Sequence, residues 1–170
     1  MGVDAYPGTW GPALPGGDLA TAVRTATRAT MRRLRLRLLP RAHLSRAPIH
    51  FSESGYPTGS GRTPDMQKTV MTSAIQAIAA DRGRYGVTDL RWFDLRDADS
   101  SNPSFESQYG LTTDDYSPKP AFFAFRKLIK RRRSAESRRT RCVRRRRRLR
   151  GARTLRTAVR RSAVAPRDHA

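Results

Sequence analysis

The sequence contains a single cysteine, Cys142, among its 170 residues. One cysteine cannot form a disulfide within the chain, and it cannot build a metal site that needs several thiolates. No stretch reaches the roughly 18 consecutive apolar residues that a membrane-spanning helix requires. The N-terminus lacks the basic region and apolar run that mark a secretory signal. From these absences we expect that the chain, as it stands, is not exported and does not insert into a membrane.

Aromatic residues are missing from one part of the chain. Residues 130–170 contain no Phe, Trp or Tyr, and they carry 18 Lys and Arg against two acidic residues, a net charge of +16 out of +21 for the chain. Such a segment cannot build a hydrophobic core, and its like charges repel one another. We therefore predict a folded domain at residues 1–129 and an Arg-rich tail at residues 130–170, which is disordered or helical.

Three explanations of the tail remain open. Its positive charge would bind nucleic acid without sequence preference, although the lack of aromatic side chains argues against stacking on single-stranded bases. A weak amphipathic pattern would suit the surface of an anionic lipid bilayer. The dominance of Arg, Ala, Pro and Thr also fits a reading frame that encodes no functional segment.

Strand and helix patterns alternate in residues 1–129. Short apolar or β-branched runs predict the strands, and capping residues with apolar periodicity predict the helices. The predicted strands are 2–6, 48–53 and 87–93, and the predicted helices are 19–39, 64–82 and 118–129. This order predicts an α/β fold with parallel strands. Because three strands are few for a parallel sheet, we expect part of a larger architecture.

Glu53 is the leading candidate for a catalytic residue. It ends an apolar strand and precedes a Gly/Pro-rich loop, and ligands bind at this end of parallel strands. The alternative is a solvated residue at a strand end. An acidic cluster at residues 94–99 is a weaker candidate for a cation site. Because its spacing lacks the Gly and the distal Glu of a calcium loop, turn chemistry is favoured and no metal is expected.

Three ordered motifs resemble the C-terminal part of bacterial glycoside hydrolases of clan A, which are (β/α)8 barrels. The motifs are DAYPGTW at 4–10, SESGYPTG at 52–59 and RWFDLRDADS at 91–100, followed by YGL at 109–111 and DYSPKPAF at 115–122. Each motif alone is weak, whereas their order and spacing together are specific. The resemblance covers residues 2–129 and corresponds to strand 6 through helix 8 of such a barrel.

The resemblance assigns roles to three residues. Glu53, at the end of strand 7, would be the nucleophile of a retaining mechanism. Tyr6, at the end of strand 6, would hydrogen-bond to this carboxylate and favour its charged form. Trp92, at the end of strand 8, would lie under the sugar ring, because an indole face suits the apolar face of a pyranose. The alternative is that Tyr6 and Trp92 are aromatic residues of a barrel core or rim.

The same resemblance predicts an incomplete catalytic pair. In this clan the acid/base glutamate ends strand 4, which the resemblance does not cover, and Glu106 lies in a loop with no supporting motif. We therefore expect a glycoside hydrolase fragment that is inactive alone, with open sheet edges and uncovered apolar surface. The expected partner is a carbohydrate, with no cofactor. The alternatives are a basic nucleic-acid-associated protein and a non-functional reading frame. A cytoplasmic location is the default expectation, although the parent enzyme resembles secreted ones.

Overall fold

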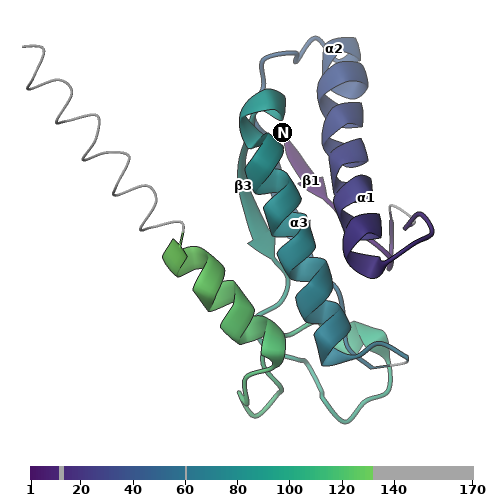
Figure 1. The fold of residues 1–170 in the computed structure, drawn as a ribbon, viewed down its shortest axis with the longest axis vertical. Helices are drawn as coiled ribbons and strands as arrows, with labels where there is room; N and C mark the ends of the chain where they lie inside the picture. Colours follow the sequence, from purple (N-terminus) through teal and green to yellow (C-terminus); the bar gives the residue numbers. More distant parts are fainter. Residues whose placement is uncertain (12–13, 60, 132–170) are drawn as a thin grey trace, which may run out of the picture. The chain divides into compact units, whose positions relative to one another are not determined.

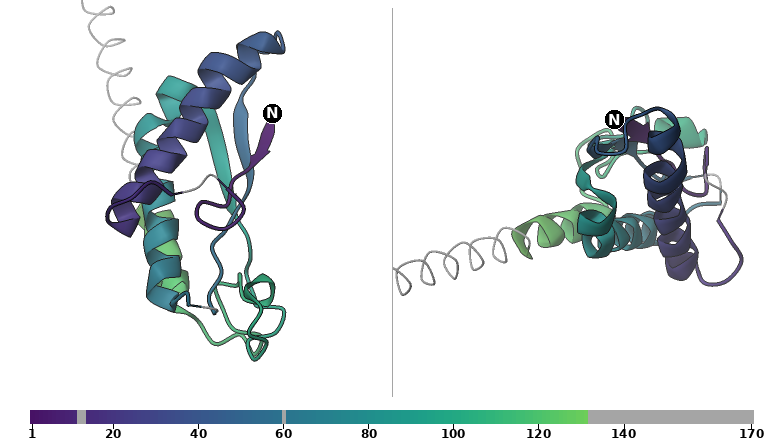
Figure 2. Two further views of the ribbon diagram at one scale, coloured as in Figure 1. Left: turned by 90° about the vertical axis from the view of Figure 1, so that its right-hand side faces the viewer. Right: turned by 90° about the horizontal axis from the view of Figure 1, so that it is seen from above.

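A three-stranded parallel sheet forms the centre of the fold. The computed structural model describes residues 1–11, 14–59 and 61–131, so the predicted tail lies outside the described residues from position 132 onward. The strands are β1 (Gly2–Asp4), β2 (Ile49–Ser54) and β3 (Val87–Trp92), in the spatial order β1-β2-β3. The helices cover one face of this sheet (Figures 1 and 2). The predicted α/β fold with three parallel strands alternating with helices is thereby confirmed.

The first helical segment is α1 (Leu19–Arg33), which continues through a π-helical turn, η1 (Leu34–Leu38), into the short α2 (Leu39–Arg41). As predicted, Asp18 caps α1, and its carboxylate accepts a hydrogen bond from the backbone N–H of Thr21 at 3.0 Å. The prediction that the helix ends before Pro40 was wrong, because the helix continues to Arg41. In the π turn, the N–H of Leu39 bonds to the carbonyl of Leu34, and Pro40, which has no N–H, is accommodated in α2.

This π turn also changes which leucine is buried. The periodicity of the sequence assigns Leu38 to the inner face of the helix, but Leu38 is exposed and Leu39 is fully buried. A π turn contains one residue more than an α-helical turn, so the inward-facing position moves one residue along the chain.

The second long helix is α3 (Pro64–Tyr85). Thr63 caps its N-terminus, as predicted, and accepts a hydrogen bond from the N–H of Met66 at 3.2 Å. The predicted end at residue 82 was wrong, because the helix runs on to Tyr85. Gly86 ends it in the left-handed conformation, with φ of 66°, and its N–H bonds to the carbonyl of Arg82.

The third predicted helix begins two residues later than expected, since residues 120–131 are helical. Ser117 does not cap it. The backbone N–H and hydroxyl of Ser117 donate instead to the carboxylate of Asp115, and the N–H of Lys119 bonds to the carbonyl of Leu111. Pro120 therefore takes the first-turn position that the sequence assigns to Pro118.

The core lies between the sheet and the helices. Arg28 of α1 and Asp81 of α3 form an ion pair at 2.9 Å that joins the two long helices. Arg35 donates to the carbonyls of Tyr85, Ser45 and Ala47, which ties η1 to the end of α3 and to the segment before β2. The largest buried cluster contains Ala5, Met31, Leu34, Leu39, Ile49, Phe51, Ile78, Tyr85 and Val87. In the described part of the chain, no helix is long and apolar enough to cross a membrane.

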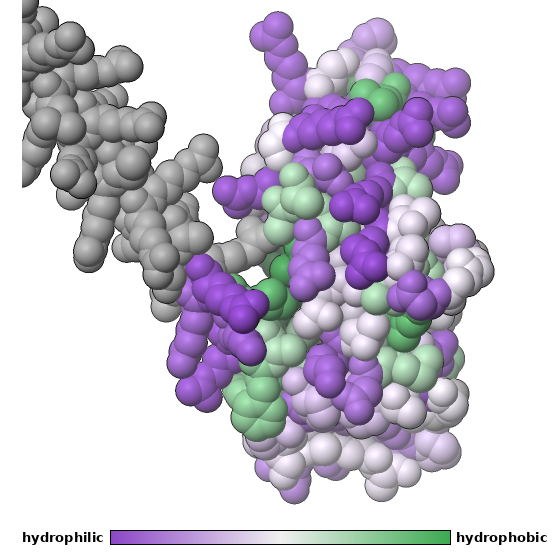
Figure 3. Space-filling model, viewed as in Figure 1, coloured by the Kyte–Doolittle hydropathy of each residue, from purple (hydrophilic) through white to green (hydrophobic). Residues whose placement is uncertain are grey.

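The opposite face of the sheet is polar. Ile49 and Phe51 point into the core, so His50 and Ser52 face away from the helices. Ser52 donates to Asp4 at 2.9 Å, and the Nδ1 atom of His50 lies 3.2 Å from the carboxylate of Asp89. These four side chains are hydrophilic, whereas large apolar side chains are exposed elsewhere, among them Trp10, Leu95 and Phe123. The helix-bearing face carries hydrophilic side chains interspersed with residues of intermediate hydropathy and some hydrophobic ones (Figure 3).

Two glycines near the end of α3 give a stability prediction. A Cβ at Gly86 would lie 2.5 Å from Nη2 of Arg35, and its φ is left-handed. We expect Gly86→Ala to lower the free energy of unfolding by about 1–2 kcal/mol, measured by urea denaturation. Gly83 lies inside α3 with no atom within 4 Å of the corresponding Cβ. The control Gly83→Ala should therefore raise stability by about 0.5–1 kcal/mol. Equal stabilisation by both variants would contradict the capping role of Gly86.

Candidate active site

A short hydrogen bond joins two of the three residues singled out by the sequence. The phenol of Tyr6 donates to Oε2 of Glu53 at 2.6 Å. Tyr6 follows β1, and Glu53 lies near the end of β2, so both occupy the carboxyl end of the sheet. Glu53 is exposed and Tyr6 is half-buried. Burial, together with the hydrogen bond to Glu53, raises the pKa of the Tyr6 phenol, which therefore stays a donor at neutral and moderately alkaline pH.

An irregularity in β2 directs Glu53 out of the core. Between Phe51 and Ser54, β2 advances three residues while β3 advances two, and the pairing with β1 shifts at the same place. The extra residue of this β-bulge therefore belongs to β2. Strict alternation from Phe51 would turn Glu53 toward the helices. With the bulge, Ser54 is buried and Glu53 is exposed.

Three aromatic rings pack together beside this carboxylate. The ring centroids of Tyr6 and Tyr109 are 5.6 Å apart, those of Phe93 and Tyr109 are 5.6 Å apart, and those of Tyr6 and Phe93 are 6.3 Å apart. All three pairs meet edge to face, which is a favourable arrangement for aromatic rings. Tyr109 is buried, and Phe93 is 40% exposed. The cluster presents an apolar surface next to Glu53.

Gly55 makes this close packing feasible. A Cβ at this position would lie 2.4 Å from the carbonyl oxygen of Phe93 and 3.0 Å from the rings of Tyr6 and Tyr109. Any side chain there would therefore displace the backbone of Phe93 or separate the rings. Glycine is therefore needed at position 55, because the segments that carry Tyr6, Phe93 and Tyr109 all approach its backbone closely.

Trp92 does not join Tyr6 and Glu53. It is partly buried against two clusters on the helix side of the sheet, which include Val70 and Leu111. Its indole nitrogen is buried without a hydrogen-bond partner in the structure. The aromatic residue beside Tyr6 is the next one, Phe93, which sequence reasoning passed over, and the peptide bond after it is cis. Phe93 directly follows the last residue of β3, so a difference of one position along the chain decides which ring reaches the site.

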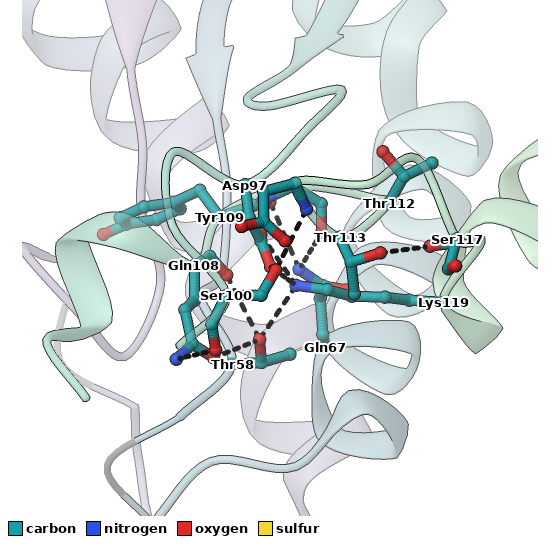
Figure 4. Close-up of polar contacts among 12 residues, drawn as sticks. Thr58, Gln67, Asp97, Ser100, Gln108, Tyr109, Thr112, Thr113, Ser117 and Lys119 are labelled. Atoms are coloured by element: carbon teal, nitrogen blue, oxygen red, sulfur yellow. Dashed lines mark hydrogen bonds and ion pairs between the residues drawn. The ribbon is translucent and has the colours of Figure 1, made fainter. Parts of the chain in front are cut away.

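A buried ion pair holds the loops that surround this end of the sheet (Figure 4). Lys119 and Asp97 are 8% and 1% exposed, and their charged groups are 2.7 Å apart. Asp97 also accepts from the hydroxyl of Ser100 at 3.0 Å and from the N–H of Gly110 at 2.7 Å. Lys119 also donates to the hydroxyl of Thr58 at 2.9 Å. The pair thus connects the loop after β2 with two parts of the segment after β3.

Gln67 of α3 also binds the same loops by hydrogen bonds. Its side-chain amide donates to the carbonyls of Tyr56, Tyr109 and Gly110 at 3.0–3.2 Å. A Cβ at Gly110 would lie 2.2 Å from the backbone nitrogen of Asp97, so the backbone passes too close for any side chain. The position of Tyr109 is therefore fixed on both sides by buried hydrogen bonds.

The acidic cluster at 94–99 serves the backbone. Asp99 accepts from the N–H and hydroxyl of Ser101, and these bonds lower its pKa, as expected for turn chemistry. Asp97 is the exception, since sequence reasoning did not foresee its buried partner, Lys119, 22 residues further along the chain. Among the described residues, no group of three or more His, Cys, Asp or Glu could hold a metal ion. Glu106 lies exposed in the short η2 helix (Phe105–Ser107).

No protein-family model and no curated protein matches the sequence. Among solved structures, the fold is similar to part of bacterial β-glucuronidases. The enzyme of Ruminococcus gnavus matches with a TM-score of 0.56 at 18% identity, over 76% of this chain and 21% of that one. One from an uncultured Clostridium sp. matches with a TM-score of 0.56 at 15% identity, over 76% and 22%. One from Bifidobacterium dentium, complexed with coumarin-3-O-glucuronide, matches with a TM-score of 0.50 at 18% identity, over 75% and 20%.

This chain thus spans about a fifth of the length of the solved structures it matches. Those neighbours are TIM-barrel glycoside hydrolases. The likeness concerns the fold, and it is consistent with three parallel strands and their helices from one part of such a barrel.

The buried ion pair gives a second stability prediction. Lys119→Met leaves the carboxylate of Asp97 buried without its counter-ion, so we expect the free energy of unfolding to fall by about 3–5 kcal/mol. The matched control is Lys68→Met, which removes an exposed pair with Asp65 and should cost less than about 1 kcal/mol. Both are measured by urea denaturation. A similar small loss for the two variants would show that the buried pair does not hold the loops.

Proposed function

We propose that this chain carries the nucleophile of a retaining glycoside hydrolase and that Glu53 is this nucleophile. The hydrogen bond from Tyr6 to Glu53, at the carboxyl end of parallel strands, is the observation that supports the proposal most directly. A retaining glycosidase needs an ionised carboxylate to attack the anomeric carbon. The phenol of Tyr6 donates to this carboxylate, fixes one of its oxygens and thereby orients it.

Phe93 is the proposed apolar surface beneath the sugar ring, in place of Trp92. Its ring is partly exposed and packs against Tyr6, whereas the indole of Trp92 lies among the helix-side clusters. An aromatic face against the apolar face of a pyranose would hold the anomeric carbon near Glu53. The structural neighbours are β-glucuronidases, so β-glucuronides are the first glycosides to test.

The second carboxylic acid of the mechanism is proposed to come from another part of a (β/α)8 barrel. Such an acid lies about 5–5.5 Å from the nucleophile and protonates the leaving oxygen. By resemblance it would end strand 4, and this chain corresponds to strands 6 to 8. In this proposal the chain is one piece of an enzyme, and it does not catalyse hydrolysis alone.

The first test extends the protein upstream. The purified 170-residue chain should show no steady hydrolysis of 4-nitrophenyl β-glucuronide or β-glucoside. If the DNA before Met1 encodes five strand–helix units with a glutamate closing the fourth, a protein that includes them should hydrolyse one of these glycosides. In that protein, Glu53→Gln should lower kcat by at least about 1,000-fold, because the attacking carboxylate is lost. Steady turnover by the short chain, or an extended enzyme indifferent to Glu53→Gln, would refute the proposal.

The role of Tyr6 is tested in the same extended enzyme. Tyr6→Phe removes one hydrogen bond to a charged group, which is worth about 1.5–3 kcal/mol, so kcat/KM should fall by about 10- to 100-fold. Tyr116→Phe is the matched control, because Tyr116 is exposed and its ring lies beside Arg96 instead of Glu53. An unchanged kcat/KM in Tyr6→Phe would remove the hydrogen bond from the mechanism.

A further inference from the structure

We propose that Trp10, Phe105 and Arg62 form a second sugar-binding position, and that it takes a pyranose bearing a carboxylate. The proposal rests on the proposed function, since it adds a neighbouring position for the same saccharide. Trp10 is 63% exposed, and its ring centroid is 5.5 Å from that of Phe105. The guanidinium carbon of Arg62 lies 5.0 Å from the centroid of the Phe105 ring and 5.5 Å from that of Tyr56. An exposed indole and a cation thus share one surface.

The three residues come from the three loops at the carboxyl end of the sheet. Trp10 follows β1, Arg62 follows β2, and Phe105 follows β3 in η2. Loops at this end bind ligands in parallel α/β folds. The cluster therefore lies at the same end of the sheet as Glu53, as a position for a second sugar requires.

Backbone hydrogen bonds hold the turns that carry Trp10 and Arg62. Tyr6 and Gly11 exchange two backbone hydrogen bonds, at 3.0 and 3.2 Å, and these close the turn that carries Trp10. Gly59 and Arg62 exchange two more, at 3.0 and 2.9 Å. A platform held by its backbone loses little conformational entropy when a ligand stacks on it.

Tyr6 connects this surface to the catalytic carboxylate. Its backbone closes the turn that carries Trp10, while its phenol donates to Glu53. Tyr109 makes a second connection, because its ring packs on Tyr6 and the side chains of Thr9 and Trp10 lie near its hydroxyl. A sugar on Trp10 and a sugar at Glu53 would thus contact adjoining residues.

The charge of Arg62 selects the chemical class. Its guanidinium is partly buried between two aromatic rings, and the ion pairs among the described residues do not include it. A partly desolvated cation without a protein counter-ion favours an anionic ligand, and a guanidinium matches a carboxylate in two parallel hydrogen bonds. In this proposal the sugar ring stacks on Trp10, and Arg62 binds the carboxylate of the sugar.

The test compares two disaccharides that differ only in this group, cellobiose and cellobiouronic acid. Both are titrated into the full 170-residue chain at 0.15 M salt, which weakens long-range attraction to the basic residues 130–170. The chain has two tryptophans, so a two-dimensional NMR spectrum shows two indole N–H signals, and Trp10→Phe identifies that of Trp10. We expect cellobiouronic acid to shift the Trp10 signal and leave that of Trp92 in place, with at least about tenfold higher affinity than cellobiose.

Arg62→Gln should abolish this preference. Trp10→Ala lacks the Trp10 signal, so its binding is measured by calorimetry, and it should bind both sugars about tenfold more weakly. Arg46→Gln is the matched control, since it removes the same charge from an exposed position before β2, at the other end of the sheet. Because binding is read from the Trp10 signal of the 170-residue chain and not from hydrolysis, failure of the hydrolase proposal would not remove the binding signal.

Four results would overturn the inference. Two concern the sugars, namely equal affinity for both or no shift of the Trp10 signal with either. The others are an equal loss of affinity in Arg46→Gln and Arg62→Gln, and a Trp10 shift that depends on protein concentration instead of sugar concentration. The last result would assign the surface to a second copy of the chain. If the extended enzyme does not hydrolyse glycosides but the chain still binds the sugar at Trp10, the proposed catalytic role of Glu53 fails and the second sugar-binding position stands.

Discussion

The buried pair of Lys119 and Asp97 is the interaction on which the loops at the carboxyl end of the sheet depend. The carboxylate accepts hydrogen bonds from an ammonium, a hydroxyl and a backbone N–H, which offsets the cost of burying its charge away from water. Through Gly110 the pair positions the residue before it, Tyr109, which packs on Tyr6 and Phe93. The surroundings of Glu53 therefore rest on a polar contact formed by residues far from it in the sequence.

Asp97 and Glu53 show how two carboxylates at one end of a sheet acquire different tasks. Asp97 is buried with several donors, and every one of them is part of the protein, so it serves structure. Glu53 is exposed and has one strong donor, Tyr6, which leaves its second oxygen available to a ligand. The number of internal hydrogen bonds separates a carboxylate that holds a loop from one that could attack a substrate.

Local patterns predicted the elements well because their causes are local. Asp18 and Thr63 cap the helices that they were expected to cap, and the three strands lie within one or two residues of their predicted bounds. The errors have equally definite causes. Because of the π turn before Pro40, Leu39 is buried in the core instead of Leu38. The helix α3 ends at Gly86, which adopts the left-handed conformation, and it continues through Gly83. Residue type alone does not distinguish two leucines or two glycines that lie close together.

The site residues depended on a feature that no residue pattern reveals, the bulge in β2. Strict alternation would bury Glu53 with Phe51, and the extra residue between Phe51 and Ser54 brings it to the exposed side. In β3, the pairing shifts between Val87 and Asp89, after which Leu90 and Trp92 lie on the helix side and Phe93 reaches the site. The structure has Glu53 and Tyr6 at the carboxyl end of the sheet, and it brings Phe93 beside Tyr6, whereas Trp92, the residue proposed from the sequence, lies on the helix side. The difference follows from the register of the strands, which is set by pairing across the sheet and not by the order of residues along one strand.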